Sequence, residues 1–174
     1  MKAQKLQQIL FVFIFGLLLL GFNLFPAFAQ KETNFWYFGA YAGVSFDSGS
    51  PVAVTDGILS TNEGCATISD SDGQLLFYTS GNRVFNRNHI QMPNGFGLAG
   101  DASSSQAAVI APLPGSNTIY YIFTVDEEGN SLGFRYTIID LSLAGGLGDV
   151  VMKNVLLLTP VSEKGNCRQT QQQF

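Results

Sequence analysis

Short runs in which apolar and polar residues alternate, separated by turn residues, fill the chain beyond residue 30. The segment Thr118–Val125 presents two largely apolar faces, which is typical of a strand covered on both sides. Further strands are expected at Leu132–Ile138, at Val150–Thr159 and at Ala107–Ala111, where Pro112 and Pro114 would end the run. No segment after the first 29 residues keeps an apolar period of 3.6 over three turns, so the pattern predicts an all-β fold.

A hairpin is expected around Asp72-Gly73, because glycine accepts the positive φ that a tight turn requires. Its strands would be Cys65–Ser69 and Leu75–Thr79. The second of these runs is similar to Tyr120–Thr124, which follows it at an offset of 45 residues. A period of this size is typical of one four-stranded propeller blade. The expected fold is therefore a partial β-propeller-like array of antiparallel sheets.

The first 29 residues have the pattern of a secretory signal peptide. Lys2 and Lys5 open the chain, an apolar run follows over Ile9–Leu20, and Ala27-Phe28-Ala29 offers small residues to a signal peptidase. Cleavage is predicted before Gln30. An uncleaved anchor helix is the alternative, but it would need about 20 unbroken apolar residues. The predicted organisation is a signal peptide over 1–29, an incomplete β-rich domain over 30–163 and a disordered or aberrant tail over 164–174.

Cleavage would leave 145 residues with 7 Lys and Arg against 13 Asp and Glu, a net charge of −6. This balance argues against a nucleic-acid partner, which would need clustered cations. No second long apolar run follows, so no membrane span is expected in the mature chain. Cys65 and Cys167 could pair in an oxidising compartment. Because Cys167 lies in the atypical tail, Cys65 is interpreted instead as a small buried core residue.

Three motifs are interpreted as structural loops or turns rather than as ligand-binding sites. Gly95–Gly100 matches a dinucleotide-binding glycine pattern, but no strand is expected before it and no helix after it, so a surface loop is predicted. Asp70–Gly73 begins like a calcium loop, yet the twelfth position is Gly81 rather than a glutamate. A hairpin turn is therefore predicted at Asp70–Gly73. Asp126–Asn130 is likewise predicted to be a solvated turn. Weak calcium binding is the alternative for each of these two turns.

The remaining candidate residues give no catalytic array. His89 is the only histidine, and it is interpreted as a loop or strand-end residue. Ser103–Ser105 lie in no nucleophile motif. Arg83 and Arg87 are interpreted as surface charges on a strand. The aromatic run Trp36–Phe38 could form a sugar-stacking platform, but core packing is preferred. No catalytic, cofactor-binding or metal residue is assigned.

Several blocks resemble the N-terminal region of large gliding-motility-associated surface proteins, which carry PKD modules and a type IX secretion sorting domain. The matching blocks are Asn34–Gly39, Thr61–Asp70, Leu76–Thr79, Asn86–His89, Met92–Gly95, Ser104–Ala107, Tyr120–Asp126 and Gly145–Val150. The resemblance covers roughly residues 30–164 and implies a propeller-like domain at the start of a longer secreted protein. In that family the propeller continues beyond the segment matching Thr159–Lys164, so a truncated product is expected here.

Three functions are compatible with the sequence. The preferred one is a non-catalytic secreted cell-surface protein, associated with adhesion or gliding motility, whose partner is an extracellular protein or a glycan. The second is a secreted glycoside-hydrolase-like propeller enzyme, which would need two carboxylates that the sequence does not place together. The third is a non-functional fragment of a broken gene. Oligomeric state is left open.

Overall fold

The computed structural model describes residues 4, 31–127 and 131–162. The chain divides into two units, Met1–Gln30 and Lys31–Phe174, and the fold below is that of the second unit. Apart from Gln4, the predicted signal peptide lies outside the described residues, as do Cys167 and the predicted tail. Among the described residues, no helix has the length and apolar character needed to cross a membrane.

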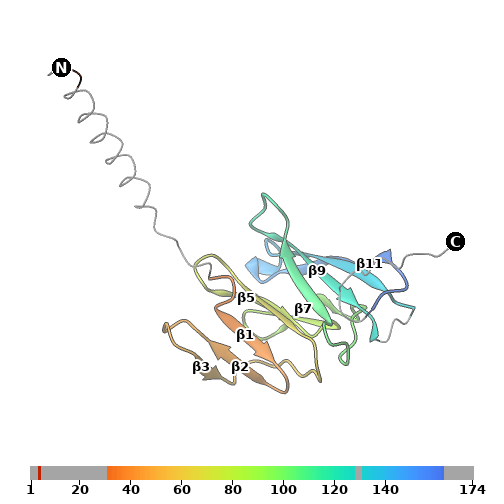
Figure 1. Ribbon diagram of the computed structural model, residues 1–174, viewed down its shortest axis with the longest axis horizontal. Coiled ribbons are helices and arrows are strands. Elements are labelled where there is room, and N and C mark those ends of the chain that lie inside the picture. Colours follow the sequence, from red (N-terminus) through yellow and green to blue (C-terminus); the bar gives the residue numbers. More distant parts are fainter. Residues whose placement is uncertain (1–3, 5–30, 128–130, 163–174) are drawn as a thin grey trace. The chain divides into compact units, whose positions relative to one another are not determined.

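In the described part of the chain, strands form three antiparallel sheets in which each strand pairs with its neighbours in sequence (Figure 1). The first sheet contains β1 (Phe35–Phe38), β2 (Ala42–Ser45) and β3 (Val52–Val54). The second contains β4 (Ala66–Ser69), β5 (Leu75–Thr79), β6 (Arg83–Asn86) and β7 (Gln91–Phe96). The third contains β8 (Ala108–Pro112), β9 (Ile119–Val125), β10 (Phe134–Asp140) and β11 (Asp149–Leu158). A short 3-10 turn, η2, spans Ala144–Gly146.

The all-β prediction is confirmed, and the predicted strands are present with small shifts of their ends. The predicted hairpin is confirmed, since β4 pairs with β5. Asp70 closes its turn, because its Oδ1 accepts hydrogen bonds from the backbone N–H groups of Asp72 (3.0 Å) and Gln74 (2.8 Å). β8 ends at Pro112, as expected from Pro112 and Pro114, and Pro112 is itself the last strand residue, paired with Tyr120. β8 is an edge strand, where a missing N–H is tolerated.

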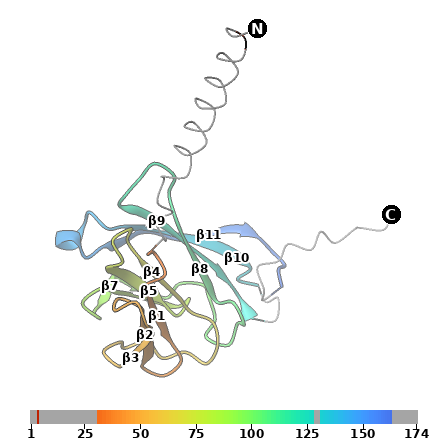
Figure 2. The same cartoon turned by 60° about the vertical axis from the view of Figure 1, so that its left-hand side comes forward.

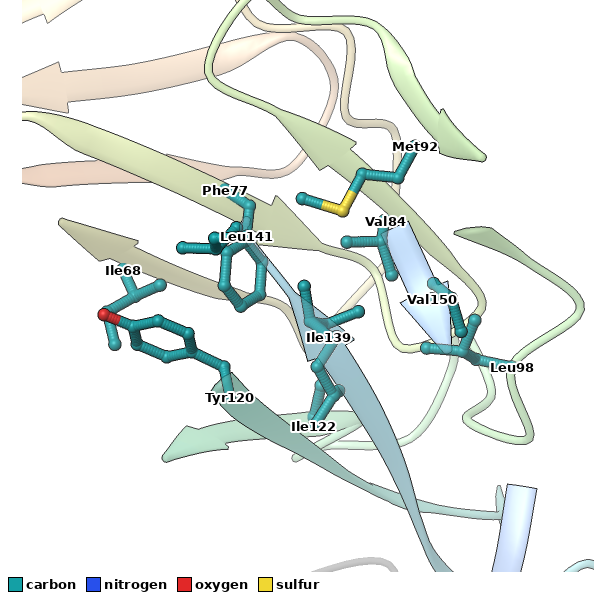
Figure 3. Packing of buried hydrophobic residues seen from close by; sticks show 11 residues of the cluster. Ile68, Phe77, Val84, Met92, Leu98, Tyr120, Ile122, Ile139, Leu141 and Val150 are labelled. Carbon is teal, nitrogen blue, oxygen red and sulfur yellow. The ribbon is translucent and has the colours of Figure 1, made fainter. Parts of the chain in front are cut away.

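The second sheet lies between the other two (Figure 2). One of its faces packs on the third sheet through Phe77, Val84 and Met92, which meet Ile122 and Ile139 in one cluster (Figure 3). The first strands of these two sheets, β4 and β8, contact each other, and so do their last strands, β7 and β11. The sheets are therefore stacked in matching order. The two similar runs, on β5 and β9, occupy the second position of their respective sheets.

The other face of the second sheet packs on the first sheet through an aromatic cluster. Tyr78 and Phe85 of the second sheet meet Tyr37 of β1, and Leu59 of the β3–β4 connection completes the contact. The rings of Tyr37 and Tyr78 stack with centroids 4.6 Å apart. Both faces of the second sheet are thus covered.

Among the described residues, only one face of the third sheet is covered, which corrects the expectation for Thr118–Val125. Tyr120 and Ile122 are buried against the second sheet, whereas Tyr121 and Phe123 of the opposite face are partly exposed. We call that opposite face the outer face. Its apolar members, grouped by strand register, are Val109, Ala111, Ile119, Tyr121, Phe123, Val125, Phe134, Tyr136, Ile138, Met152, Val155 and Leu158; of these, Val125 is buried. None of them belongs to either buried cluster of the described residues.

Candidate binding cleft

Connections between strands gather beside the first and second sheets and enclose a cleft of about 450 Å³. They are the β1–β2, β3–β4, β5–β6 and β7–β8 connections. The side chains that give the cleft its chemical character are Tyr41, Ile58, Ser60, Asn82, Arg83 and Asp101. A rigid scaffold that presents several loops to one hollow is the usual way in which proteins build binding sites.

Tyr41 stands at the turn between β1 and β2 with most of its ring in solvent. Its φ of +59° lies in the left-handed region, which a tyrosine adopts only where its surroundings impose it. Two backbone hydrogen bonds do so: Tyr41 N–H donates to the Leu59 carbonyl (2.8 Å), and Thr61 N–H donates to the Gly39 carbonyl (3.0 Å). The side chain is nevertheless 58% exposed. The chain therefore holds the backbone firmly and leaves the ring available.

The β5–β6 turn supplies the cation of the cleft. Thr79 holds this turn, because its Oγ1 donates to the Arg83 carbonyl (2.7 Å) and accepts from Gly81 N–H (3.0 Å). Gly81 has a φ of +83° and lies so close to Gly100 that a Cβ on Gly100 would lie 2.7 Å from the Gly81 carbonyl oxygen. The exposed guanidinium of Arg83 makes no hydrogen bond or ion pair with any described residue. Arg83 is the surface charge that the sequence predicted, and it also lines the cleft.

The β7–β8 connection supplies the anion. Asp101 Oδ1 accepts hydrogen bonds from the backbone N–H and the hydroxyl of Ser103, both at 2.8 Å. These hydrogen bonds lower the pKa of the Asp101 carboxyl. The Ser103 hydroxyl also meets Glu127 Oε2 at short range. Two carboxylates therefore converge on one hydroxyl beside the cleft, a pairing that their separation in the sequence concealed.

A polar network joins the first and second sheets close to the cleft. The Tyr37 hydroxyl donates to Asp56 Oδ1 (2.9 Å), and Asp56 Oδ2 lies 3.4 Å from His89 Nε2. His89 Nδ1 lies 3.2 Å from the Tyr78 hydroxyl, which accepts from Ile58 N–H (3.2 Å). Burial and the hydrogen bond to Asp56 raise the pKa of Tyr37 far above its usual range, and burial raises the pKa of Tyr78. His89 lies in a connection, as predicted, but this network was not foreseen.

Several interpretations of individual residues need correction. Trp36 and Phe38 were expected in the core, but they are 51% and 40% exposed; only Tyr37 of that run is buried. Gly95–Gly100 is no surface loop: its start belongs to β7, and Leu98 is buried. Cys65 is half-buried rather than fully buried, and burial raises the pKa of its thiol.

Arg87, expected on a strand, lies just after β6, and its side chain donates to the Gly146 carbonyl (2.7 Å).

In the region that the structure describes, no group of three or more His, Cys, Asp or Glu residues is placed to hold a metal ion. Comparison of the chain with models of protein families, with curated proteins and with solved structures found no match.

Proposed function

We propose that this chain is an exported, non-catalytic binding protein of the cell surface, which meets an extracellular partner at the cleft. The single observation that carries the proposal is the convergence of four connections around an open hollow that contains an exposed aromatic ring and unengaged polar groups. The signal-peptide pattern supports export. The blocks that resemble gliding-motility-associated surface proteins support a role in adhesion or motility.

The scaffold of this proposal is a propeller-like array. The matching order of the second and third sheets, with first strand against first strand and last against last, is what radial repetition of one meander produces. The outer face of the third sheet is apolar. In the second sheet, both faces are apolar and both are buried against neighbouring sheets. Large apolar surfaces of this type mark contacts with further protein, so we propose that another β-sheet covers the outer face.

Binding assays on the purified full chain test the proposal. The chain is incubated with intact cells, with extracellular polysaccharides and with surface-protein extracts, and retention is measured by co-sedimentation. Saturable retention on at least one of these surfaces is expected. The N-terminal sequence of the exported protein should begin at Gln30. Absence of retention on every surface would refute the binding role, and recovery of the protein with Met1 intact would refute cleaved export.

A second candidate, a secreted glycoside hydrolase, is favoured by one observation. Asp101 and Glu127 both contact the Ser103 hydroxyl, and hydrolysis of a glycosidic bond requires two carboxyl groups at short separation. A panel of polysaccharides incubated with the full chain decides between the candidates. Turnover that Glu127→Gln abolishes would establish the enzyme, whereas binding without turnover supports the preferred function.

A further inference from the structure

We infer that the cleft takes a neutral saccharide, with Tyr41 as the stacking surface; the inference rests on the proposed binding function. The groups that line the cleft and have side-chain atoms to spare are an aromatic ring, a guanidinium, a carboxylate and a hydroxyl, provided by Tyr41, Arg83, Asp101 and Ser60. A sugar presents both a ring face of C–H groups and several hydroxyls, and this set can meet both.

The balance of charge selects a neutral ligand. Arg83 and Asp101 both line the cleft, yet no ion pair joins them in the described structure. An anionic ligand that approached Arg83 would be repelled by the Asp101 carboxylate, and a cationic ligand that approached Asp101 would be repelled by the Arg83 guanidinium. A sugar hydroxyl both donates and accepts, so it can donate to the carboxylate and accept from the guanidinium without a net charge of its own. Hydrogen bonds to ionised groups are the stronger kind.

The aromatic component is placed for stacking rather than for packing. The Tyr41 ring is 58% exposed, and it takes part in neither buried cluster of the described residues. Its backbone is fixed by hydrogen bonds to the β3–β4 connection. Little backbone freedom is therefore lost when a ligand settles on the ring, which favours binding by a shallow site.

The walls on the other side of the cleft are equally fixed. The Asn82 amide donates to the Leu98 carbonyl (3.1 Å), and Leu98 N–H donates to the Asn82 carbonyl (3.0 Å). Gly100 N–H donates to the Gly81 carbonyl (3.1 Å), which ties the β5–β6 connection, directly before Arg83, to the β7–β8 connection that carries Asp101. The backbone segments that carry the donor and the acceptor for sugar hydroxyls thus keep their separation in the absence of a ligand.

An oligosaccharide array with the full chain tests the inference. It carries neutral gluco-, galacto- and manno-oligosaccharides beside uronic-acid oligosaccharides and cell-surface protein. Binding to a neutral member is expected, with an affinity that stays within about twofold when NaCl is raised, because no net charge is neutralised. Tyr41→Ala should weaken this binding about tenfold, Tyr41→Phe should largely retain it, and Arg83→Gln and Asp101→Asn should each weaken it.

Trp36→Ala provides the matched control, because Trp36 is a comparably exposed aromatic outside the cleft. Loss of binding with Trp36→Ala but not with Tyr41→Ala would overturn the inference in favour of the face of β1. Salt-sensitive binding to uronic acids alone, or binding to protein alone, would overturn it and leave the proposed binding function standing. Binding to nothing on the array or on cells would remove both. Circular dichroism spectra of all variants verify that they are folded.

Discussion

The two faces of the second sheet are covered by contacts of different chemistry. Toward the third sheet, the contact is built from aliphatic and aromatic side chains such as Phe77, Ile122 and Ile139, all fully buried. Toward the first sheet, the rings of Tyr37 and Tyr78 stack on each other. Their hydroxyls form hydrogen bonds, that of Tyr37 with Asp56 and that of Tyr78 with His89. Apolar burial is non-directional and scales with area, whereas hydrogen-bonded hydroxyls impose one arrangement.

This difference explains why the candidate cleft lies where it does. The rim of the third-sheet contact is polar too, since Asn94 Nδ2 donates to Asp149 Oδ1 (3.0 Å) and Lys153 Nζ donates to the Phe96 carbonyl (2.8 Å). The contact between the first and second sheets differs because it brings Ile58 N–H to the Tyr78 hydroxyl and places Ile58 at the edge of the cleft. The network thereby fixes the β3–β4 connection, on which the position of Tyr41 depends. The first-sheet contact positions the side of the cleft that carries Tyr41. Asn154 of the third sheet holds the connection that carries Asp101, because it accepts from Ala99 N–H (2.9 Å) and donates to the Gly97 carbonyl (2.8 Å).

The largest effect is expected from a matched pair on β10. Ile139 is fully buried against the second sheet, while its neighbour Ile138 lies on the outer face and is partly exposed. Ile139→Ala should lower the free energy of unfolding by about 2–5 kcal/mol, because it leaves a cavity. Ile138→Ala should cost less than about 1.5 kcal/mol. Urea denaturation measures both, and equal losses would contradict the one-sided burial of the third sheet.

Removing the Tyr78 hydroxyl should have the next largest effect. Tyr78→Phe keeps the stacked ring but leaves Ile58 N–H without its acceptor. An unsatisfied donor at a partly buried site costs about 1–3 kcal/mol. Urea denaturation measures this loss. The affinity for a cleft ligand should fall as well, since the β3–β4 connection loses an anchor; unchanged stability and affinity would show that the network does not position the cleft.

Alkaline pH should weaken the contact with the first sheet. The folded-state pKa of Tyr37 is raised above its unfolded value of 10.0. The unfolded chain therefore ionises first, so the stability from Tyr37 is complete below about pH 10 and is lost as pH rises toward the folded pKa. Unfolding curves at pH 8 and pH 11 should show this loss, and it should be smaller in Tyr37→Phe. An identical pH dependence in the variant would contradict the assignment.

The smallest effect on stability is expected in the cleft itself. Arg83→Gln removes a guanidinium that makes no hydrogen bond or ion pair with a described residue. Its effect on the free energy of unfolding should therefore stay within about 0.5 kcal/mol. A larger loss in urea denaturation would show that Arg83 has a structural partner rather than being available to a ligand.

Much of the fold could be predicted because it follows from local pattern. Alternation located β9 and β10, and Asp72-Gly73 located the hairpin between β4 and β5. The burial of each face could not be predicted, because it depends on which sheets stack. Trp36 and Tyr121 have large aromatic side chains of the kind usually found in cores, yet both lie on faces that no described cluster covers.

The cleft could not be predicted from the sequence for a related reason. Tyr41, Arg83 and Asp101 lie far apart in the chain and belong to no motif with a fixed spacing. Stacked sheets alone bring their connections together. One local signal was available: the turn residues around Gly81 and Gly100 marked connections, although nothing indicated that these two glycines meet.

Saturation-transfer NMR on the full chain with a neutral oligosaccharide tests the central claim, binding at the cleft without turnover. The account predicts saturation transfer to the sugar ring protons, loss of that transfer in Tyr41→Ala, and an unchanged oligosaccharide spectrum after prolonged incubation. New reducing-end signals that disappear in Glu127→Gln would contradict it, since they would show that the carboxylates of Asp101 and Glu127 serve catalysis.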